Sequence, residues 1–190
     1  HIRTMRKDGG GLICTAVHPL AAQRLGLPFA HEILNGCNAV ERLGEVPYDP
    51  KNRSSFSLWV NHRSTFTGIT DRDRTLTVNS IAEQVRKSMN GGGADFPRHF
   101  RTPGHVAILR AADRLLDQRW GQTELSIVLA EAAGVTPAMV ICEMLDDETG
   151  FALSRKDAEE YARKHGIVFV DGAHVMDWWK ERKSMNTPLP

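Results

Sequence analysis

The sequence lacks the features of a protein with a structural zinc site, of a membrane-spanning protein and of a secreted protein. Its three cysteines (Cys14, Cys37 and Cys142) are odd in number and widely spaced, and no CxxC pair occurs. A structural zinc site is therefore not expected. No stretch approaches the roughly eighteen consecutive apolar residues of a membrane span, and the first residues show no secretory signal. We expect a cytoplasmic protein with no membrane partner.

The sequence also has no excess of charge of one sign. The 24 Lys and Arg residues are balanced by 23 Asp and Glu residues, which gives a formal net charge of +1. This balance provides no electrostatic reason to expect a nucleic-acid partner. With 190 residues, of which 41% are hydrophobic, the chain is long enough for one sizeable globular domain. A second small domain is compatible with this length but not required.

Strand and helix patterns alternate along most of the chain. Apolar or alternating runs predict strands at 11–17, 55–62, 105–111, 138–145 and 167–170, the third after a Thr-Pro-Gly turn. Helices are predicted at 19–27, from 71 to 89, from 122 to 133, at 155–166 and at 173–183. In the third helix the apolar residues at helical spacing are predicted to face the core: Leu125, Val128, Leu129, Ala132 and Ala133. Residues 35–52 predict a long loop. The alternation predicts a mixed sheet with helices packed on it.

The stretch RWGQTEL (residues 119–125) leads into a predicted helix. If Gln122 or Thr123 caps this helix, the free N–H groups of its first turn favour a phosphate. Arg119 could close on the same anion with paired hydrogen bonds. Glu124 argues partly against this, because a first-turn carboxylate stabilises the helix dipole and repels an anion. The local pattern alone favours a plain helix start over a phosphate cradle.

Two other residues are candidates for proton transfer. A lone histidine is more often structural than catalytic, but His105 lies at a loop-to-strand joint, where an acid or base could act. Glu143 lies in the apolar run VICEML, where a carboxylate is costly to bury unless paired or protonated. It either faces solvent on an edge strand or points into a cleft as a general base. The segment 71–74 (DRDR) predicts a solvated helix start with local ion pairs.

Five motifs occur in the order GGGLICTA, FTGITDR, RTPGHV, RWGQTE and VICEMLDD. Together, over nearly the whole chain, they resemble the 3,4-dihydroxy-2-butanone 4-phosphate synthase family in its archaeal form. The resemblance implies a lyase of riboflavin biosynthesis that converts D-ribulose 5-phosphate to formate and L-3,4-dihydroxy-2-butanone 4-phosphate. It also implies an α+β fold with a mixed sheet, a single domain over residues 1–190, a homodimer with active sites near the subunit interface, and Mg²⁺ or Mn²⁺ as cofactor.

The resemblance further implies roles for individual residues. It implies a phosphate-binding loop made of Arg119, Gly121, Gln122 and Thr123. It makes His105 essential and Glu143 a substrate-contacting acid or base, with Thr67 and Cys14 lining the same pocket. These roles suit the reaction, because enolising a ketose phosphate needs proton transfer near neutral pH and a fixed phosphate. A divalent cation would stabilise the enediolate.

The sequence departs from the family pattern at two points. The family carries an acidic loop, similar to RE.E.D, that supplies a glutamate metal ligand and an aspartate substrate contact. No stretch here matches that loop, so we expect the sequence to correspond to the family domain without its N-terminal part. Where the family motif GHTE has a metal-binding histidine, this chain has Gln122.

The glutamine bears on both the cofactor and the activity. An amide oxygen can ligate Mg²⁺, so Gln122 is a candidate metal ligand, but we expect weaker metal binding than with a histidine and tighter binding after Gln122→His. The alternative hypothesis is a diverged or inactive family member that serves as a sugar-phosphate-binding module.

Overall fold

The computed structural model describes residues 1–37 and 53–185, which divide into two compact units. Unit 2 holds residues 14–141, and unit 1 holds residues 1–13 together with the described residues from 142 onward. The single domain over 1–190 stays a prediction. From residue 38 onward, the predicted loop at 35–52 lies outside the described residues.

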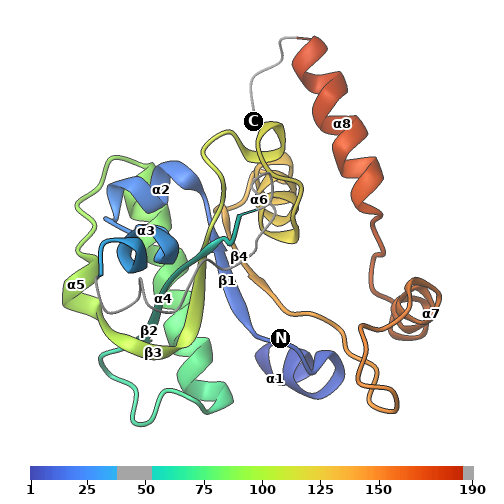
Figure 1. Ribbon diagram of the computed structural model, residues 1–190, viewed down its shortest axis with the longest axis horizontal. Helices are drawn as coiled ribbons and strands as arrows, with labels where there is room; N and C mark the ends of the chain where they lie inside the picture. Colours follow the sequence, from blue (N-terminus) through green and yellow to red (C-terminus); the bar gives the residue numbers. More distant parts are fainter. Residues whose placement is uncertain (38–52, 186–190) are drawn as a thin grey trace. The chain divides into compact units, whose positions relative to one another are not determined.

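A four-stranded sheet forms the centre of unit 2 (Figure 1). Its strands are β1 (Cys14–Val17), β2 (Phe56–His62), β3 (Phe100–Arg110) and β4 (Ala138–Ile141). The strand order is β2-β3-β1-β4. β1 runs parallel to β3, with Cys14 opposite Ala107, whereas β2 with β3 and β1 with β4 pair antiparallel. The predicted mixed sheet is confirmed.

Helices pack on this sheet within unit 2. They are α2 (Pro19–Arg24), α3 (Ala30–Asn35), α4 (Asp71–Met89), α5 (Phe96–His99) and α6 (Gln122–Ala132), with a short 3₁₀ helix η3 (Leu115–Asp117) before α6. The apolar residues of α2 and α4 form one core with the sheet, in which Ala21, Ile81, Val85, Val106 and Ile108 are fully buried. α6 packs on β1 and β4. No helix in the described ranges is both long and apolar enough to cross a bilayer.

Unit 1 is mainly helical. Its helices are α1 (Ile2–Thr4), the π-helical turn η1 (Met5–Gly9), α7 (Arg155–His165) and α8 (Gly172–Ser184). α7 begins and ends as predicted, because the Ser154 hydroxyl accepts a hydrogen bond from the Asp157 N–H and Gly166 ends the helix in a left-handed conformation.

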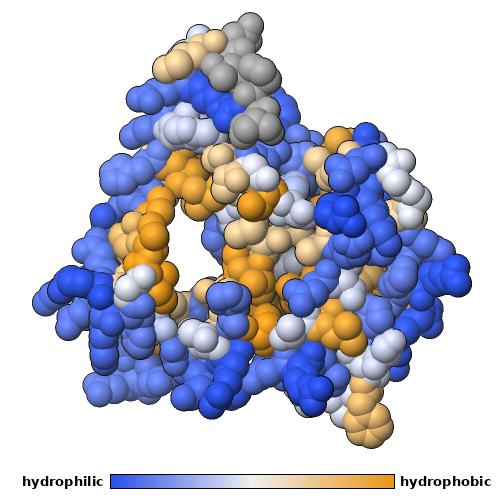
Figure 2. Space-filling model, turned by 180° about the vertical axis from the view of Figure 1, so that it is seen from behind, coloured by the Kyte–Doolittle hydropathy of each residue, from blue (hydrophilic) through white to orange (hydrophobic). Residues whose placement is uncertain are grey.

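The strand predicted at 167–170 is wrong. In the part of unit 1 that the structure describes, this segment is irregular and pairs with no strand, and its four apolar side chains are between 42% and 83% exposed. Hydrophobic (orange) surface of this kind is visible on the left side of Figure 2. Strand propensity alone does not make a strand, because the backbone N–H and C=O groups need a partner strand.

Three predicted strands have different boundaries, and the helix predicted at 19–27 ends at Arg24. β3 begins at Phe100, so Thr102, Pro103 and Gly104 lie inside the strand rather than in a turn. They lie opposite a register shift of β2 between Val60 and Asn61, and such an irregularity tolerates a proline. The predicted strands at 11–17 and 138–145 shrink to β1 and β4.

The buried face of α6 also differs from the prediction. The buried residues are Thr123, Glu124, Ile127, Val128 and Ala130, whereas Leu129 is 40% exposed. The hydrophobic pattern missed this rotation because the helix buries a carboxylate, for which apolar spacing gives no signal.

Candidate active site

Unit 2 contains two polar clusters that hold most of the predicted site residues. We call Arg119, Gly121, Gln122, Thr123 and Glu124 the cradle cluster. We call Asn61, Thr67, Asp73 and His105 the imidazole cluster.

The cradle cluster is built around a buried ion pair. The Glu124 side chain is fully buried, and its Oε2 accepts a hydrogen bond from Arg119 Nη1 at 2.5 Å. Its Oε1 accepts a hydrogen bond from the Ala112 N–H at 2.9 Å. Arg119 Nε donates to the Arg53 carbonyl oxygen at 2.9 Å. The Arg119 guanidinium, which was expected to bind an anion, is therefore bound to Glu124. The same ion pair neutralises the Glu124 carboxylate, so this carboxylate does not repel an anion at the start of the helix.

The start of α6 carries no capping side chain. Gly121 is the N-cap, and a Cβ there would collide with the Arg119 guanidinium in its present position. Gln122 is exposed. Thr123 is fully buried, and its Oγ1 has no hydrogen-bond partner within the described ranges. The first turn thus offers uncapped N–H groups beside an unsatisfied hydroxyl, an arrangement that suits an anion.

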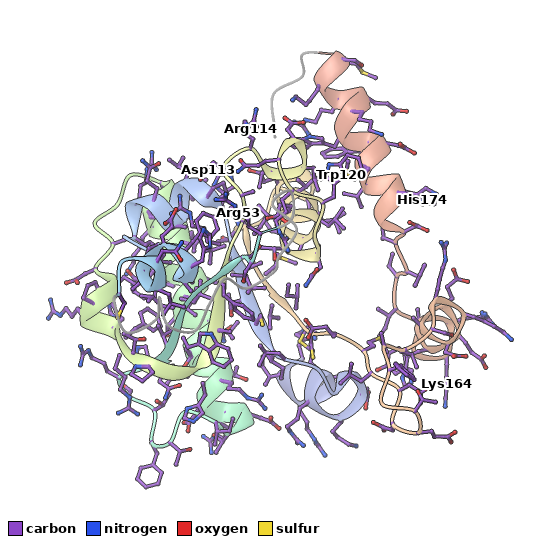
Figure 3. The ribbon with its side chains drawn as sticks, viewed as in Figure 1. Arg53, Asp113, Arg114, Trp120, Lys164 and His174 are labelled. Atoms are coloured by element: carbon purple, nitrogen blue, oxygen red, sulfur yellow. The ribbon has the colours of Figure 1, made fainter. Side chains whose placement is uncertain are left out.

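A cavity of about 300 Å³ opens beside Arg119. Arg53 and Asp113, from the segments before β2 and after β3, line it and lie close together in Figure 3. Asp113 also forms an ion pair with Arg110 at 3.0 Å. The cavity wall therefore carries both signs of charge.

The imidazole cluster is organised by Asn61, which is only 4% exposed. Asn61 Oδ1 accepts a hydrogen bond from the His105 N–H at 2.8 Å. Asn61 Nδ2 donates to the Thr67 carbonyl oxygen at 3.3 Å and lies 3.1 Å from His105 Nδ1. The His105 side chain itself is exposed. The structure thus brings His105 and Thr67 together through one buried amide.

Asp73 anchors the loop that carries Thr67. Its Oδ2 accepts hydrogen bonds from the Gly68 N–H at 2.9 Å and from the Thr67 hydroxyl at 3.4 Å. The hydrogen bond from Gly68 is the main cause that holds the pKa of Asp73 below its ordinary value. The predicted local ion pairs are confirmed for Arg74 and Asp71, which pair at 2.9 Å. Asp73 instead accepts hydrogen bonds from the loop that carries Thr67.

The two remaining predicted residues have different environments. Cys14 is 3% exposed in β1, opposite Ala107 of β3. Glu143 belongs to unit 1, after the end of β4, and is exposed, which agrees with the solvent-facing alternative. Its Oε2 accepts a hydrogen bond from the Leu12 N–H at 2.9 Å.

The two clusters of unit 2 are far apart along β3. His105 is five residues before Arg110, the last residue of β3, and this distance is about 17 Å at roughly 3.3 Å per residue. The cradle cluster lies beyond that end, where Glu124 binds the Ala112 N–H. Unit 2 of a single chain therefore does not bring His105 to Thr123.

Sequence reasoning missed Asn61 and Asp73. Asn61 falls inside the predicted strand at 55–62, and Asp73 inside the predicted solvated helix start at 71–74. A buried asparagine inside a strand pattern is a signal in principle, because a buried amide must find hydrogen-bond partners.

No cluster of acidic or imidazole side chains marks a metal site among the described residues. Among them there is no group of three or more His, Cys, Asp or Glu side chains that could hold a metal ion. The exposed Gln122 offers one neutral oxygen donor, whereas Mg²⁺ is usually held by one or two carboxylates together with substrate oxygens and water.

Comparisons with known proteins agree on one family. The family profile described as 3,4-dihydroxy-2-butanone 4-phosphate synthase matches residues 1–178. The proteins of that name from Archaeoglobus fulgidus and Methanosarcina acetivorans are 53% and 51% identical to this chain. These alignments cover 99% and 93% of this chain, and 81% and 74% of the respective relatives.

Solved structures of the same name have a similar fold. The synthase of Candida albicans aligns with a TM-score of 0.71 at 28% identity, over 93% of this chain and 76% of that one. A synthase in complex with two magnesium ions aligns with a TM-score of 0.75 at 26% identity, over 96% of this chain and 79% of that one.

Proposed function

Since the chain belongs to the 3,4-dihydroxy-2-butanone 4-phosphate synthase family, we propose that it is a lyase of riboflavin biosynthesis acting in the cytoplasm. It converts D-ribulose 5-phosphate to L-3,4-dihydroxy-2-butanone 4-phosphate and formate. The observation that carries this proposal is the nearly full-length similarity to archaeal synthases.

The cradle cluster is proposed to hold the substrate phosphate. The uncapped N–H groups of α6, the unsatisfied Thr123 hydroxyl and the exposed Gln122 support this role. Arg119 contributes through its ion pair, which neutralises Glu124 next to the site. Gly121 permits that approach.

The remaining residues are proposed to act on the sugar. His105 and Glu143 are the groups for proton chemistry, and both side chains are exposed. Thr67 and Cys14 would line the same pocket.

A divalent cation is part of the proposal. A structural relative is described in complex with two magnesium ions, which supports a cation requirement for this chain. The cation would supply positive charge against the enediolate oxygens. Gln122 is the proposed ligand from this part of the chain, and we propose Mg²⁺ or Mn²⁺ as the ion.

We also propose a homodimer in which each active site combines the two clusters from different protomers. The separation of the clusters along β3 within one unit 2 supports this arrangement. Figure 1 agrees, since the loop before α4 and the helix α6 lie at opposite ends of unit 2. Phe66, beside Thr67, is 93% exposed, and Trp120, beside Gly121, is 72% exposed, so each cluster has an aromatic side chain that a second copy could cover.

Formate release tests the activity. The protein is incubated with ribulose 5-phosphate and Mg²⁺, and formate is measured with His105→Gln as the matched variant. Formate from the unaltered protein and none from His105→Gln is the expected result. Retained binding of ribulose 5-phosphate without formate would favour the alternative of a sugar-phosphate-binding module.

Mixing two inactive variants tests the shared site. His105→Ala removes the imidazole, and Gln122→Glu places a repelling charge at an exposed helix start without disturbing the fold. In an equal mixture of exchanging protomers, about a quarter of the activity should return, because half of the dimers contain one intact site. No recovery, in a mixture shown to contain heterodimers, would contradict the shared site.

A further inference from the structure

We propose that Asn61 is a positioning residue that fixes His105 as a neutral hydrogen-bond donor, with the ring proton on Nε2. The geometry of Asn61 and His105 carries this assignment, and its meaning for catalysis rests on the proposed function. The sequence alone left open whether His105 acts as an acid or as a base, and this assignment decides between the two roles.

The orientation of the Asn61 amide follows from two backbone groups of fixed polarity. The His105 N–H can only donate, so the atom 2.8 Å from it is the amide oxygen. The Thr67 carbonyl can only accept, so the atom 3.3 Å from it is the amide nitrogen. The amide nitrogen is therefore also the atom that lies 3.1 Å from His105 Nδ1.

This orientation determines the tautomer of the imidazole. Because Asn61 Nδ2 donates, His105 Nδ1 must accept with its lone pair. The proton of the neutral ring then lies on Nε2. A proton on Nδ1 of the neutral ring would instead place two donors, that N–H and the Asn61 amide nitrogen, opposite each other.

Two glycines make room for Asn61. Gly68 has a φ of +93°, and a Cβ there would collide with the Asn61 amide group. A Cβ on Gly104 would collide with the backbone of Val60 and Asn61. Asp73 fixes the Gly68 side of this arrangement through the Gly68 N–H. The amide can therefore reach both the His105 N–H and the Thr67 carbonyl oxygen, and the polarity of these two groups sets its orientation.

The consequence is a specific role for His105. The other ring nitrogen, Nε2, then carries an N–H on an exposed side chain. Such a group donates a hydrogen bond to a carbonyl or enediolate oxygen and stabilises the charge that develops there. It does not take a proton from carbon, so the base of the reaction must be a different group.

Nitrogen NMR of ¹⁵N-histidine-labelled full-length protein tests the tautomer directly, with His105 assigned by its loss in His105→Gln. We expect the Nε2–H tautomer in the unaltered protein. Asn61→Asp places an acceptor beside Nδ1, so the proton should move to Nδ1 or the ring should become charged near neutral pH. A ring that carries its proton on Nδ1 in the unaltered protein, or a tautomer unchanged by Asn61→Asp, would overturn the proposal.

Kinetics separate positioning from folding. Asn61→Asp should lower kcat at least tenfold with a smaller change in KM, and should move one limb of the pH profile of kcat to higher pH. Gln84→Glu is the matched control, because Gln84 is a 3% exposed amide that binds the Asp95 N–H away from His105. It should leave the His105 tautomer and the pH profile unchanged. Equal effects in both variants would overturn the positioning role, whereas full activity in His105→Gln would instead contradict the proposed function.

Discussion

The cradle cluster and the imidazole cluster hold their polar side chains by different physical means. In the cradle cluster, Glu124 is fully buried and its charge is neutralised by Arg119. In the imidazole cluster, a neutral amide is oriented by backbone groups, and the imidazole it holds is exposed. A site built on a buried ion pair is destabilised when either charged partner is removed. A site built on an oriented amide is disturbed when a bulkier side chain is placed next to the amide, or when a donor is replaced by an acceptor.

The largest effect is expected from breaking the ion pair. Arg119→Met leaves the Glu124 carboxylate buried without a counter-ion, which should lower the free energy of unfolding by about 3–5 kcal/mol. Urea unfolding measures this change. Adding Glu124→Gln should restore part of the loss, because the amide oxygen can still accept from the Ala112 N–H.

The control for this prediction is an exposed ion pair. The Arg86 and Glu83 side chains, 52% and 43% exposed, pair at 2.7 Å within α4. Arg86→Met should leave the free energy of unfolding nearly unchanged, because exposed ion pairs contribute little to stability. Similar losses in Arg119→Met and Arg86→Met would mean that burial of Glu124 does not decide the stability of the cradle cluster.

A smaller loss is expected from crowding the imidazole cluster. Gly104→Ala forces the Val60 and Asn61 backbone to move, which should cost about 1–3 kcal/mol and shift the NMR signals of His105. Gly93→Ala is the matched change, because a Cβ there has nothing within 4 Å and should be neutral or stabilise by about 0.5 kcal/mol. Equal stability of the two variants would show that the approach at Gly104 is not tight.

The sequence predicted more of the fold than of the site. Alternating patterns and boundary residues located the mixed sheet and helices such as α4, α7 and α8, because these depend on local spacing and capping. The buried face of α6 was mispredicted because its rotation depends on a long-range bond from Glu124 to Ala112. The strand at 167–170 was mispredicted because pairing depends on a partner that local composition does not reveal.

The site could be predicted only in part, because it too depends on contacts between residues that are distant in the sequence. The motifs named His105, Thr67 and Thr123, but nothing in their spacing showed that Asn61 joins the first two. That link comes from the register of β2 and β3, which brings a buried amide to both residues. The distance between His105 and the cradle cluster likewise follows from the length of β3.

The third prediction separates stability from binding in the cradle cluster. Thr123→Val removes a buried hydroxyl that has no partner in the described ranges, so the unfolding free energy should stay within about 1 kcal/mol or rise. If that hydroxyl binds the phosphate, KM for ribulose 5-phosphate should rise by about tenfold. Thr15→Val is the control, because Thr15 also buries an unpartnered hydroxyl, in β1. An equal KM in both variants would remove Thr123 from the phosphate site.

The smallest effect concerns the charge that Asp73 adds to the imidazole cluster. Because hydrogen bonds, first that from Gly68, lower the pKa of Asp73 in the folded protein, its stabilisation of the loop is fully present above the unfolded value of about 4. It is lost as the pH falls through the lower, folded value. Asp73→Asn should therefore speed hydrogen exchange at the Gly68 N–H a few-fold at neutral pH, and the difference from the unaltered protein should shrink in acid. Asp146→Asn is the control, because Glu148 and Thr149 N–H groups lower the pKa of that carboxyl in unit 1, and it should leave Gly68 unchanged. A difference that persists undiminished at low pH would mean that shape, rather than charge, holds the loop, and the imidazole cluster would then depend on packing alone.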